Sequence, residues 1–195
     1  MLFEKIYLQQ FFENSRQVNA IKAKEIADVF EEKEVKKGEL FLKEGQVSNQ
    51  YLILKDGFMR AYSFDLDDNE VTTAFHSKTY PVFEVASFFN RTPSKENIQA
   101  LTDCYGWMIT YEQLNMLFHS IPEFRNFGRA ILVKGFAALK TRMLSMITET
   151  AEERYVALIE SNPEIFLYAP LKQIASYLGI TDTSLSRIRK EMMKK

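Results

Sequence analysis

The chain of 195 residues is long enough for one medium domain, or for a domain with a small appendage, and it can bury a hydrophobic core. Apolar residues make up 46% and charged residues 26%, the ordinary balance of a globular protein. The single cysteine, Cys104, excludes an internal disulfide and any iron–sulfur or zinc site built only from the thiolates of one chain. No apolar run reaches the roughly 20 residues that cross a bilayer, and no signal peptide opens the sequence, so we expect a cytoplasmic protein with no membrane partner.

Charge is distributed unevenly along the chain, although its formal net value is only −1. Residues 170–195 hold six basic and two acidic side chains, whereas residues 1–169 hold 19 basic and 24 acidic ones. A basic end on an acidic body is an electrostatic reason to look for a nucleic-acid surface at that end. The six basic residues are Lys172, Arg187, Arg189, Lys190, Lys194 and Lys195.

Residues 1–31 are predicted to be helical, with an apolar face made of Val18, Ile21, Ile26, Val29 and Phe30. The pattern changes in residues 34–111, where short apolar or alternating runs are broken at close intervals by Gly, Asp and Asn. Many short strands at such spacing indicate a β-sandwich or barrel. The predicted strands are 40–42, 51–54, 58–64, 71–75, 98–101 and 107–109.

The helical period returns from Pro122 to about Thr148, and its apolar face is too broad for a solvated surface helix. We expect one side of this helix to pack on the barrel and the other on a second copy of the chain, a wholly intramolecular helix being the alternative. Gly128 and Gly135 stand one heptad apart, which suits a close approach of two helix backbones, although a helix that merely tolerates glycine would look the same. The predicted dimer seam consists of Leu132, Phe136, Leu139, Met143 and Met146.

The C-terminal segment predicts two short helices joined by a turn of three to four residues. Pro170 and Gly179 frame the first helix, because proline suits the first helical position and glycine the position just past the end. Thr181 is predicted to cap a second helix from Asp182 to about Met193. This arrangement is typical of a helix-turn-helix DNA-binding motif. The expected buried residues are Leu171, Ile174, Ala175, Leu178, Ile180, Leu185, Ile188 and Met192.

The opposite face of the second helix presents hydroxyl groups and then cations, namely Thr183, Arg187, Lys190 and Lys194. We expect Arg187 to read a base, most naturally guanine, because its guanidinium can donate two parallel hydrogen bonds. Phosphate or secondary contacts are predicted for Thr181, Thr183, Ser184 and Lys190, with Lys172 as a further candidate. The alternative is a pair of capping helices whose charges face only water.

Several segments, taken in order, resemble the catabolite activator/FNR (CRP/FNR) family of transcription regulators over residues 15–193. The resemblance implies a cyclic-nucleotide-binding-like β-roll, a long dimerisation helix and a C-terminal winged-helix domain that acts on promoters. The winged helix is expected to be truncated, since the chain stops at Lys195 where the family usually adds a β-wing. The resembling segments are Lys37–Gly45, Tyr51–Gly57, Ile98–Cys104, Ile174–Thr181 and Leu185–Arg189.

The resemblance also places the family's ligand cassette at Phe83-Glu84 and Ser94-Lys95. Nucleotide-binding members present Gly-Glu and then Arg-Ser or Arg-Thr, with the glutamate on the ribose and the arginine on the cyclic phosphate. Here Phe83 stands at the glycine position and Ser94 at the arginine position, so tight binding of cyclic AMP is not expected unless Lys95 or Arg91 supplies the charge. The phenylalanines at 83, 88 and 89 indicate either an apolar pocket or simple filling of the core.

The resemblance places Asp182 and Thr183 where the family's base-reading arginine and glutamate lie, so a different target sequence is expected, with Arg187 retained. An oxygen-sensing cluster would need several N-terminal cysteines, which the sequence lacks. The two histidines, His76 and His119, are too scattered to indicate haem binding. The sequence shows no Ser-His-Asp set, metal cluster, phosphate loop or carboxylate pair. We therefore predict no enzymatic activity and no bound metal or cofactor.

The sequence therefore predicts an α+β protein with an N-terminal β-roll of the cyclic-nucleotide-binding-like jelly-roll type, a long dimerisation helix and a C-terminal helix-turn-helix. The predicted parts are a sensor domain at 1–121, the dimerisation helix at 122–149 and the DNA-binding domain at 150–195. The expected function is homodimeric transcription regulation, with promoter or operator DNA, a second copy of the chain and RNA polymerase as partners. The alternative is a ligand-binding or protein-interaction module whose C-terminal helices dock a protein partner, and salt-dependent DNA affinity separates the two.

Overall fold

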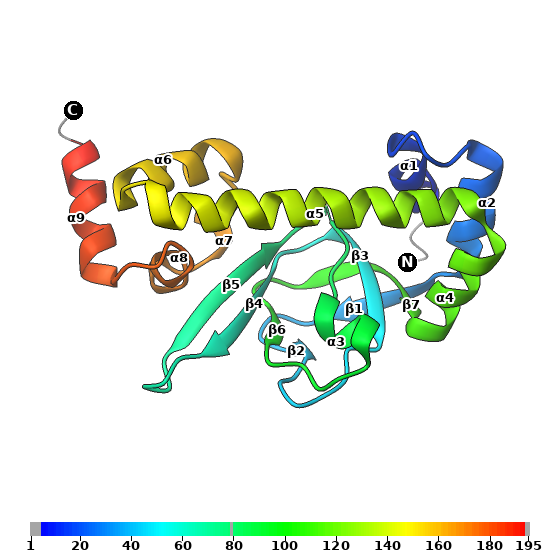
Figure 1. Cartoon of the computed structure of the whole chain (residues 1–195), viewed down its shortest axis with the longest axis horizontal. Coiled ribbons are helices and arrows are strands. Elements are labelled where there is room, and N and C mark those ends of the chain that lie inside the picture. The colour runs from blue at the N-terminus through cyan, green and yellow to red at the C-terminus, as the bar shows by residue number, and fades with distance from the viewer. Residues whose placement is uncertain (1–4, 79, 194–195) are drawn as a thin grey trace.

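The computed structural model describes residues 5–78 and 80–193. Its N-terminal half contains a β-roll of two antiparallel sheets, as the sequence predicts (Figure 1). One sheet has the strand order β1-β7-β3 and the other the order β2-β6-β4-β5. The strands are β1 (Glu31–Val35), β2 (Leu40–Leu42), β3 (Gln50–Asp56), β4 (Met59–Phe64), β5 (Glu70–His76), β6 (Asn97–Ala100) and β7 (Cys104–Thr110).

The hydrophobic runs of the sequence do not predict strand β1. Its sequence, Glu-Glu-Lys-Glu-Val, has four charged residues and only one apolar residue. It pairs with β7 from Glu31 opposite Met108 to Val35 opposite Cys104, and only Val35 is buried. It lies at the edge of its sheet. Charged side chains on an edge strand discourage pairing with other chains, which accounts for this composition.

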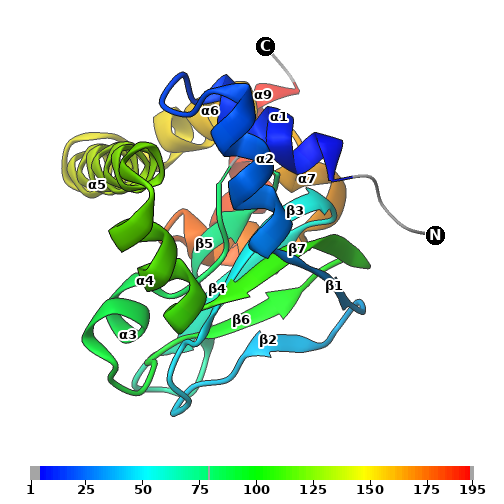
Figure 2. The same ribbon diagram turned by 90° about the vertical axis from the view of Figure 1, so that its right-hand side faces the viewer.

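Helices α1 (Ile6–Asn14) and α2 (Ala20–Val29) confirm the helical prediction for the N-terminal region and pack at one end of the roll (Figure 2). Residues 1–4 of that prediction lie outside the described residues. Val18 and Ile26 are buried as expected, but Ile21 is 81% exposed, so its place on the apolar face was wrongly predicted. The core here is aromatic: the Phe12 ring contacts the rings of Phe11, Phe30, Phe124 and Phe127.

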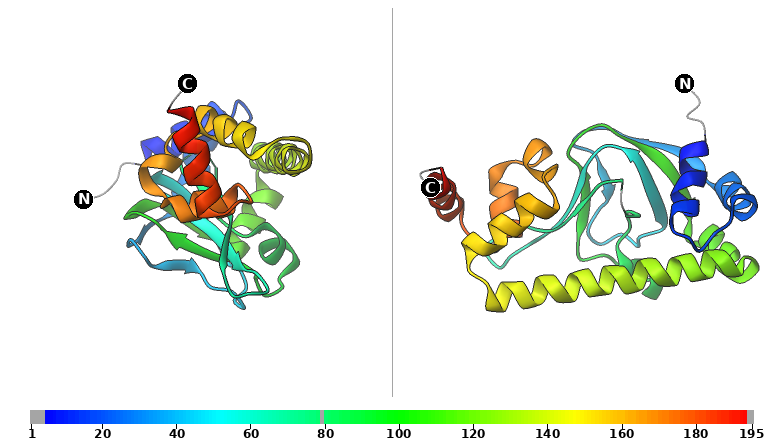
Figure 3. Two further views of the ribbon diagram at one scale, coloured as in Figure 1. Left: turned by 90° about the vertical axis from the view of Figure 1, so that its left-hand side faces the viewer. Right: turned by 90° about the horizontal axis from the view of Figure 1, so that it is seen from above.

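Helix α5 (Pro122–Thr148) has the predicted bounds and runs along most of one side of the molecule (Figure 3). Its first turns are buried against α4 (Tyr111–Ser120). Gly128 belongs to this intrachain contact, since a β carbon there would lie 2.5 Å from the Phe118 ring. The expectation that Gly128 marks the approach of a second backbone was therefore wrong. Around Gly135 nothing lies within 4 Å of such a carbon, so that position stays open to a partner.

The C-terminal quarter consists of α6 (Ala151–Ser161), α7 (Ile165–Tyr168), α8 (Leu171–Tyr177) and α9 (Asp182–Met192). These helices enclose a core around Tyr155, Ile174 and Leu185 that also includes Phe58 from the roll. Leu171 is 41% exposed, which corrects its predicted burial. The predicted boundary after residue 149 coincides with the break between α5 and α6, but the division into three domains stays a prediction because this core is shared.

The remaining helix, α3 (Val85–Asn90), lies between β5 and β6 in the chain, within the predicted cassette. Phe83 and Phe88 are buried in the same core as Tyr51, so the phenylalanines of this segment fill the core. Across the part of the chain that the structure describes, no helix combines the length and apolar character needed to span a membrane.

Candidate functional site

The α8–α9 pair lies at the opposite end of the molecule from α1 and α2 (Figure 1). Its turn comprises residues 178–181 and contains Gly179 at φ +69°, a left-handed conformation that glycine adopts without strain. The carbonyl of Ala175 accepts a hydrogen bond from the Ile180 N–H, at 3.0 Å, which closes the end of α8. These observations confirm the two predicted helices and the short turn between them.

The start of α9 is held by a cluster of hydroxyl groups. The Thr181 hydroxyl accepts a hydrogen bond from the Ser184 N–H at 3.2 Å, as the predicted N-cap should. It also lies 2.9 Å from the Thr183 hydroxyl and 3.0 Å from the Ser184 hydroxyl. Three hydroxyl groups therefore meet at the helix N-terminus, where unpaired backbone N–H groups and the helix dipole favour an anion.

The outer face of α9 exposes the side chains that the sequence singled out for DNA contact. Thr183, Arg187 and Lys190 are exposed, and Ser184 is half-buried. Leu185 on the opposite face is buried and packs with the α8 core. The ion pairs recorded for residues 5–78 and 80–193 involve neither Arg187 nor Lys190, and Lys172 on α8 is exposed as well. Lys194 and Lys195 lie outside the described residues.

From Leu132 onwards, α5 exposes an apolar stripe. The side face of α5 turned away from the roll carries no other helix or strand of the described chain (Figure 3). Within the predicted seam, exposure is greatest at Phe136, at 70%, and at Leu139, at 63%, and Ile147 beside the seam is 74% exposed. Met146 differs from the rest of the seam, since a β carbon on Gly179 would lie 2.4 Å from its methyl carbon, so it also packs on the α8–α9 turn. The exposed apolar residues are Leu132, Val133, Phe136, Leu139, Met143, Leu144, Met146 and Ile147.

In the predicted ligand cassette, the polar side chains form hydrogen bonds with backbone groups of the same segment. The Glu84 carboxylate caps α3 by accepting from the N–H groups of Ala86, at 3.0 Å, and Ser87, at 2.5 Å. The Ser94 hydroxyl donates to the carbonyl of Glu96 at 2.8 Å and accepts from its N–H at 3.0 Å. Glu84 and Ser94 are thus used to hold the cassette together, which accounts for both residues without a ligand.

Of the two alternative cations, Arg91 is engaged by other partners. Arg91 donates to the Ser48 carbonyl at 3.0 Å and to Asn49 Oδ1 at 2.7 Å, and its guanidinium stacks 4.0 Å from the Tyr111 ring. Lys95 is exposed. Burial, together with the charge of Glu84, raises the pKa of the nearby Glu96 carboxyl. The Thr73 hydroxyl and the charge of Arg142 act in the opposite direction on the pKa of the same carboxyl.

His76 ends β5 opposite Met59, and its Nε2 atom is buried without a hydrogen-bond partner among the described residues. Burial lowers the pKa of His76 from 6.5 to about 4. The folded protein therefore keeps this imidazole neutral, and the stability it contributes above pH 6.5 is lost as the pH falls towards 4.

We expect wild-type protein to lose about 3 kcal/mol of unfolding free energy through His76 between pH 7 and pH 4. His76→Phe should remove this part of the pH dependence, whereas the same change at the exposed His119 should leave it intact. Urea unfolding at a series of pH values measures both. Parallel pH profiles for His76→Phe and the wild type would contradict a buried neutral imidazole.

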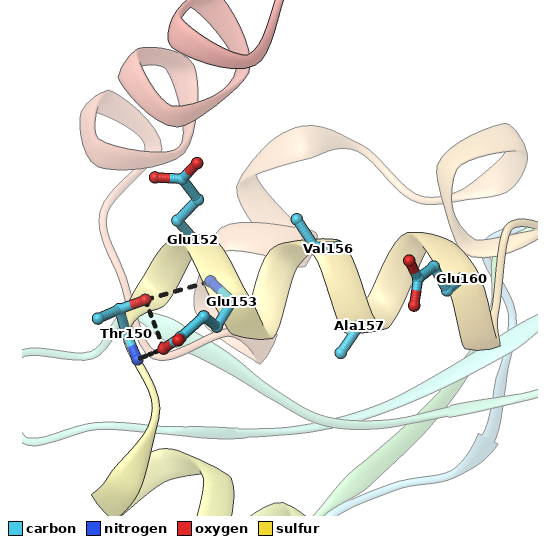
Figure 4. A pocket seen from close by; sticks show the side chains of 6 residues that line it. All are labelled: Thr150, Glu152, Glu153, Val156, Ala157 and Glu160. Atoms are coloured by element: carbon cyan, nitrogen blue, oxygen red, sulfur yellow. Dashed lines mark hydrogen bonds between the residues drawn. The ribbon is translucent and has the colours of Figure 1, made fainter. Parts of the chain in front are cut away.

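A surface hollow on α6 is lined by Thr150, Glu152, Glu153, Val156, Ala157 and Glu160 (Figure 4). Thr150 and Glu153 form a reciprocal helix cap there, with the Thr150 N–H donating to the Glu153 carboxylate at 2.8 Å. Helix α6 and its N-cap residue supply all six residues, so we assign the hollow to helix capping. Within the described ranges, no group of three or more His, Cys, Asp or Glu side chains could hold a metal ion.

Comparison with known proteins agrees with this architecture. Residues 32–120 match the family model of the cyclic nucleotide-binding domain. No curated protein matches the chain. FixK2 from Bradyrhizobium japonicum has a similar structure, with a TM-score of 0.74, 18% identity and 85% of each chain covered.

Two further solved structures align over most of the chain. A putative transcriptional regulator of the CRP/FNR family from Eubacterium rectale has a TM-score of 0.70 and 18% identity, with 94% of this chain and 88% of that chain covered. The c-di-GMP-responsive global regulator CLP from Xanthomonas campestris has a TM-score of 0.70 and 15% identity, with 90% and 92% covered. Residues 32–120 therefore resemble the cyclic nucleotide-binding domain, and the chain shares its fold with these solved structures, one of them described as a putative CRP/FNR regulator.

Proposed function

We propose that this chain is a homodimeric transcription regulator that binds promoter DNA through the α8–α9 pair. The observation that carries the proposal is the exposed face of α9, where Arg187 and Lys190 follow a cluster of hydroxyl groups at the helix N-terminus. Such a face suits the major groove, since side chains of the first turns reach base edges while cations and hydroxyls hold phosphates. The fold shared with CRP/FNR regulators supports the same function.

The exposed stripe of α5 supports the homodimer. An apolar patch of this extent on a monomer is unusual, and a straight helix can bury it against a second copy of itself. Two copies joined along α5 with the helices parallel would place both α9 helices at the same end of the assembly, as binding of two half-sites requires. We further propose that the protein works in the cytoplasm and contacts RNA polymerase, that no enzymatic activity is involved, and that its effector is not cyclic AMP.

The alternative function is a ligand-binding or protein-interaction module whose C-terminal helices dock a protein partner. Leu167 and Tyr168, on the exposed side of α7 beside the helix pair, are the feature that favours it. Binding to DNA depends steeply on salt because counterions are released from the phosphates. Docking through Leu167 and Tyr168 would instead be driven by apolar burial and would depend little on salt.

Arg187→Ala is expected to cost about 1–3 kcal/mol on the preferred site and to relax the preference at one base position. Lys190→Ala should weaken binding to all sequences by similar amounts and flatten the salt dependence, because it removes only a phosphate contact. Fluorescence anisotropy with preferred and scrambled duplexes, at several salt concentrations, measures both. Equal binding of all duplexes by wild type and Arg187→Ala would remove the assignment of Arg187 as a base reader.

A further inference from the structure

Helix α8 packs on the outer face of the four-stranded sheet of the roll. The Phe75 ring lies 5.1 Å from the Tyr177 ring and 5.7 Å from the Phe58 ring, which connects β5 directly to α8. The N–H of Thr72 on the edge strand β5 donates to the Ser176 hydroxyl at 3.1 Å. The helix pair is therefore attached to the roll as well as to the end of α5.

Arg142 of α5 joins three elements at this contact. Its guanidinium donates to the Thr73 carbonyl of β5 at 2.5 Å and to the Tyr177 carbonyl of α8 at 3.0 Å. The same group stacks 4.0 Å from the Tyr177 ring. Tyr177 is the last residue of α8, where unpaired carbonyls and the helix dipole favour a cation. The arginine fork reaches the two carbonyls from two different nitrogens, Nη1 and Nη2, while its plane stacks on the ring, a geometry that lysine does not reproduce.

Arg60 forms a second connection at the other side of the same contact. Its side chain is 4% exposed, pairs with Glu70 and donates to Gln99 Oε1 at 3.1 Å. The Gln173 amide of α8 lies 3.2 Å from Arg60 Nε and Nη1, and only the amide orientation that turns its oxygen towards the guanidinium satisfies both groups. A buried charge with these partners resists sliding of α8 along the sheet, because sliding would leave the charge unpaired.

None of these contacts uses the exposed face of α9. Arg142 and its partners contact α8 where it meets β5, whereas Arg187 and Lys190 are exposed on α9. Because Arg142 lies on α5, the contact fixes the helix pair relative to the helix along which two copies would join. The distance and angle between the two α9 helices of a dimer would then depend on this contact.

We propose that Arg142 is a positioning residue that sets the orientation of the α8–α9 pair relative to α5, and with it the spacing at which a dimer reads two half-sites. This inference rests on the proposed DNA-binding function. It assigns the roll a second role besides any ligand binding: the outer face of β4 and β5 is the surface on which α8 packs.

The test compares Arg142→Gln with the matched control Arg129→Gln, an exposed arginine on the same helix. Each protein is titrated with the duplex that the wild type selects and with the same duplex cut to one half-site. Arg142→Gln should lose affinity for the two-half-site duplex by roughly tenfold or more, because two misplaced α9 helices lose the gain from binding both half-sites at once. Its affinity for the single half-site should fall by less than about twofold. Arg129→Gln should match the wild type on both duplexes. Equal losses on the two duplexes, or no loss, would overturn the proposal.

Hydrogen exchange provides a readout that needs no DNA. Arg142→Gln should speed amide exchange in residues 70–76 and 171–178, while the core of α4 keeps its protection. Unchanged exchange in both segments would overturn the positioning contact, whatever the DNA-binding result. A wild-type protein that fails to bind DNA would refute only the proposed function. If Arg142→Gln does not fold, Ser176→Ala removes the bond to Thr72 from the surface of α8 and should show the same pattern at smaller size.

Discussion

Replacing Leu139 with aspartate is expected to convert the dimer into monomers. The Leu139 side chain is 63% exposed in one copy of the chain and lies in the middle of the α5 stripe. In a dimer joined along α5, each copy would place an unpaired carboxylate in an apolar seam, which costs several kcal/mol. Sedimentation velocity should show a monomer, and binding to a two-half-site duplex should fall with it, since one reader cannot engage both half-sites.

Thr141→Asp is the matched control, because Thr141 is exposed on the same helix but off the predicted seam. This variant should sediment as the wild type does. The leucine variant should also keep its circular dichroism spectrum, since the side chain contributes little to the core of one chain. A wild-type monomer at micromolar concentration without DNA, or a dimeric Leu139→Asp protein, would contradict the assignment of the seam.

Cyclic AMP and cyclic GMP are expected not to bind tightly. A cyclic phosphate carries a full charge, which must leave water to enter the roll, and this is costly without a fixed cation. Ser94 is bonded to the backbone of Glu96, and Arg91 is committed to Ser48, Asn49 and Tyr111. Loss of a bidentate charge-assisted pair should cost on the order of 2–5 kcal/mol.

Titration calorimetry with both nucleotides measures this prediction. We expect no heat of binding at micromolar nucleotide, under conditions where the protein is folded and dimeric. Submicromolar affinity for either nucleotide would show that Lys95 or Arg91 turns inwards to meet the phosphate, and that the hydrogen bonds of the cassette give way to a ligand.

The roll and the two long helical regions were predictable because their hydrophobic periods are strong. Most predicted strands agree with the structure to within two residues, and α5 has the predicted bounds. Strand β1 escaped prediction because its four charged residues carry no alternating pattern, and only its pairing with β7 makes it a strand. Sequence periodicity reports which face is buried, whereas an edge strand of this kind is defined by its neighbour.

In the candidate site too, local features could be predicted from the sequence and contacts between distant elements could not. Thr181 as a cap and the exposed cations of α9 followed from local patterns. The role of Gly128 did not, because the Phe118 ring that fills the space beside it comes from another helix. The contact made by Arg142 was also beyond sequence reasoning, since both of its hydrogen-bond acceptors are backbone carbonyls, which carry no residue signature.

Selection of bound sequences from random duplex DNA with the purified wild-type protein tests the central claim most directly. We expect enrichment of a sequence with two related half-sites about one helical turn apart, as two recognition helices of a symmetric dimer require. Affinity for it should fall steeply with salt and exceed affinity for random DNA by about 10³-fold or more. A folded, dimeric protein that enriches no sequence and shows no salt-dependent DNA binding would contradict the account.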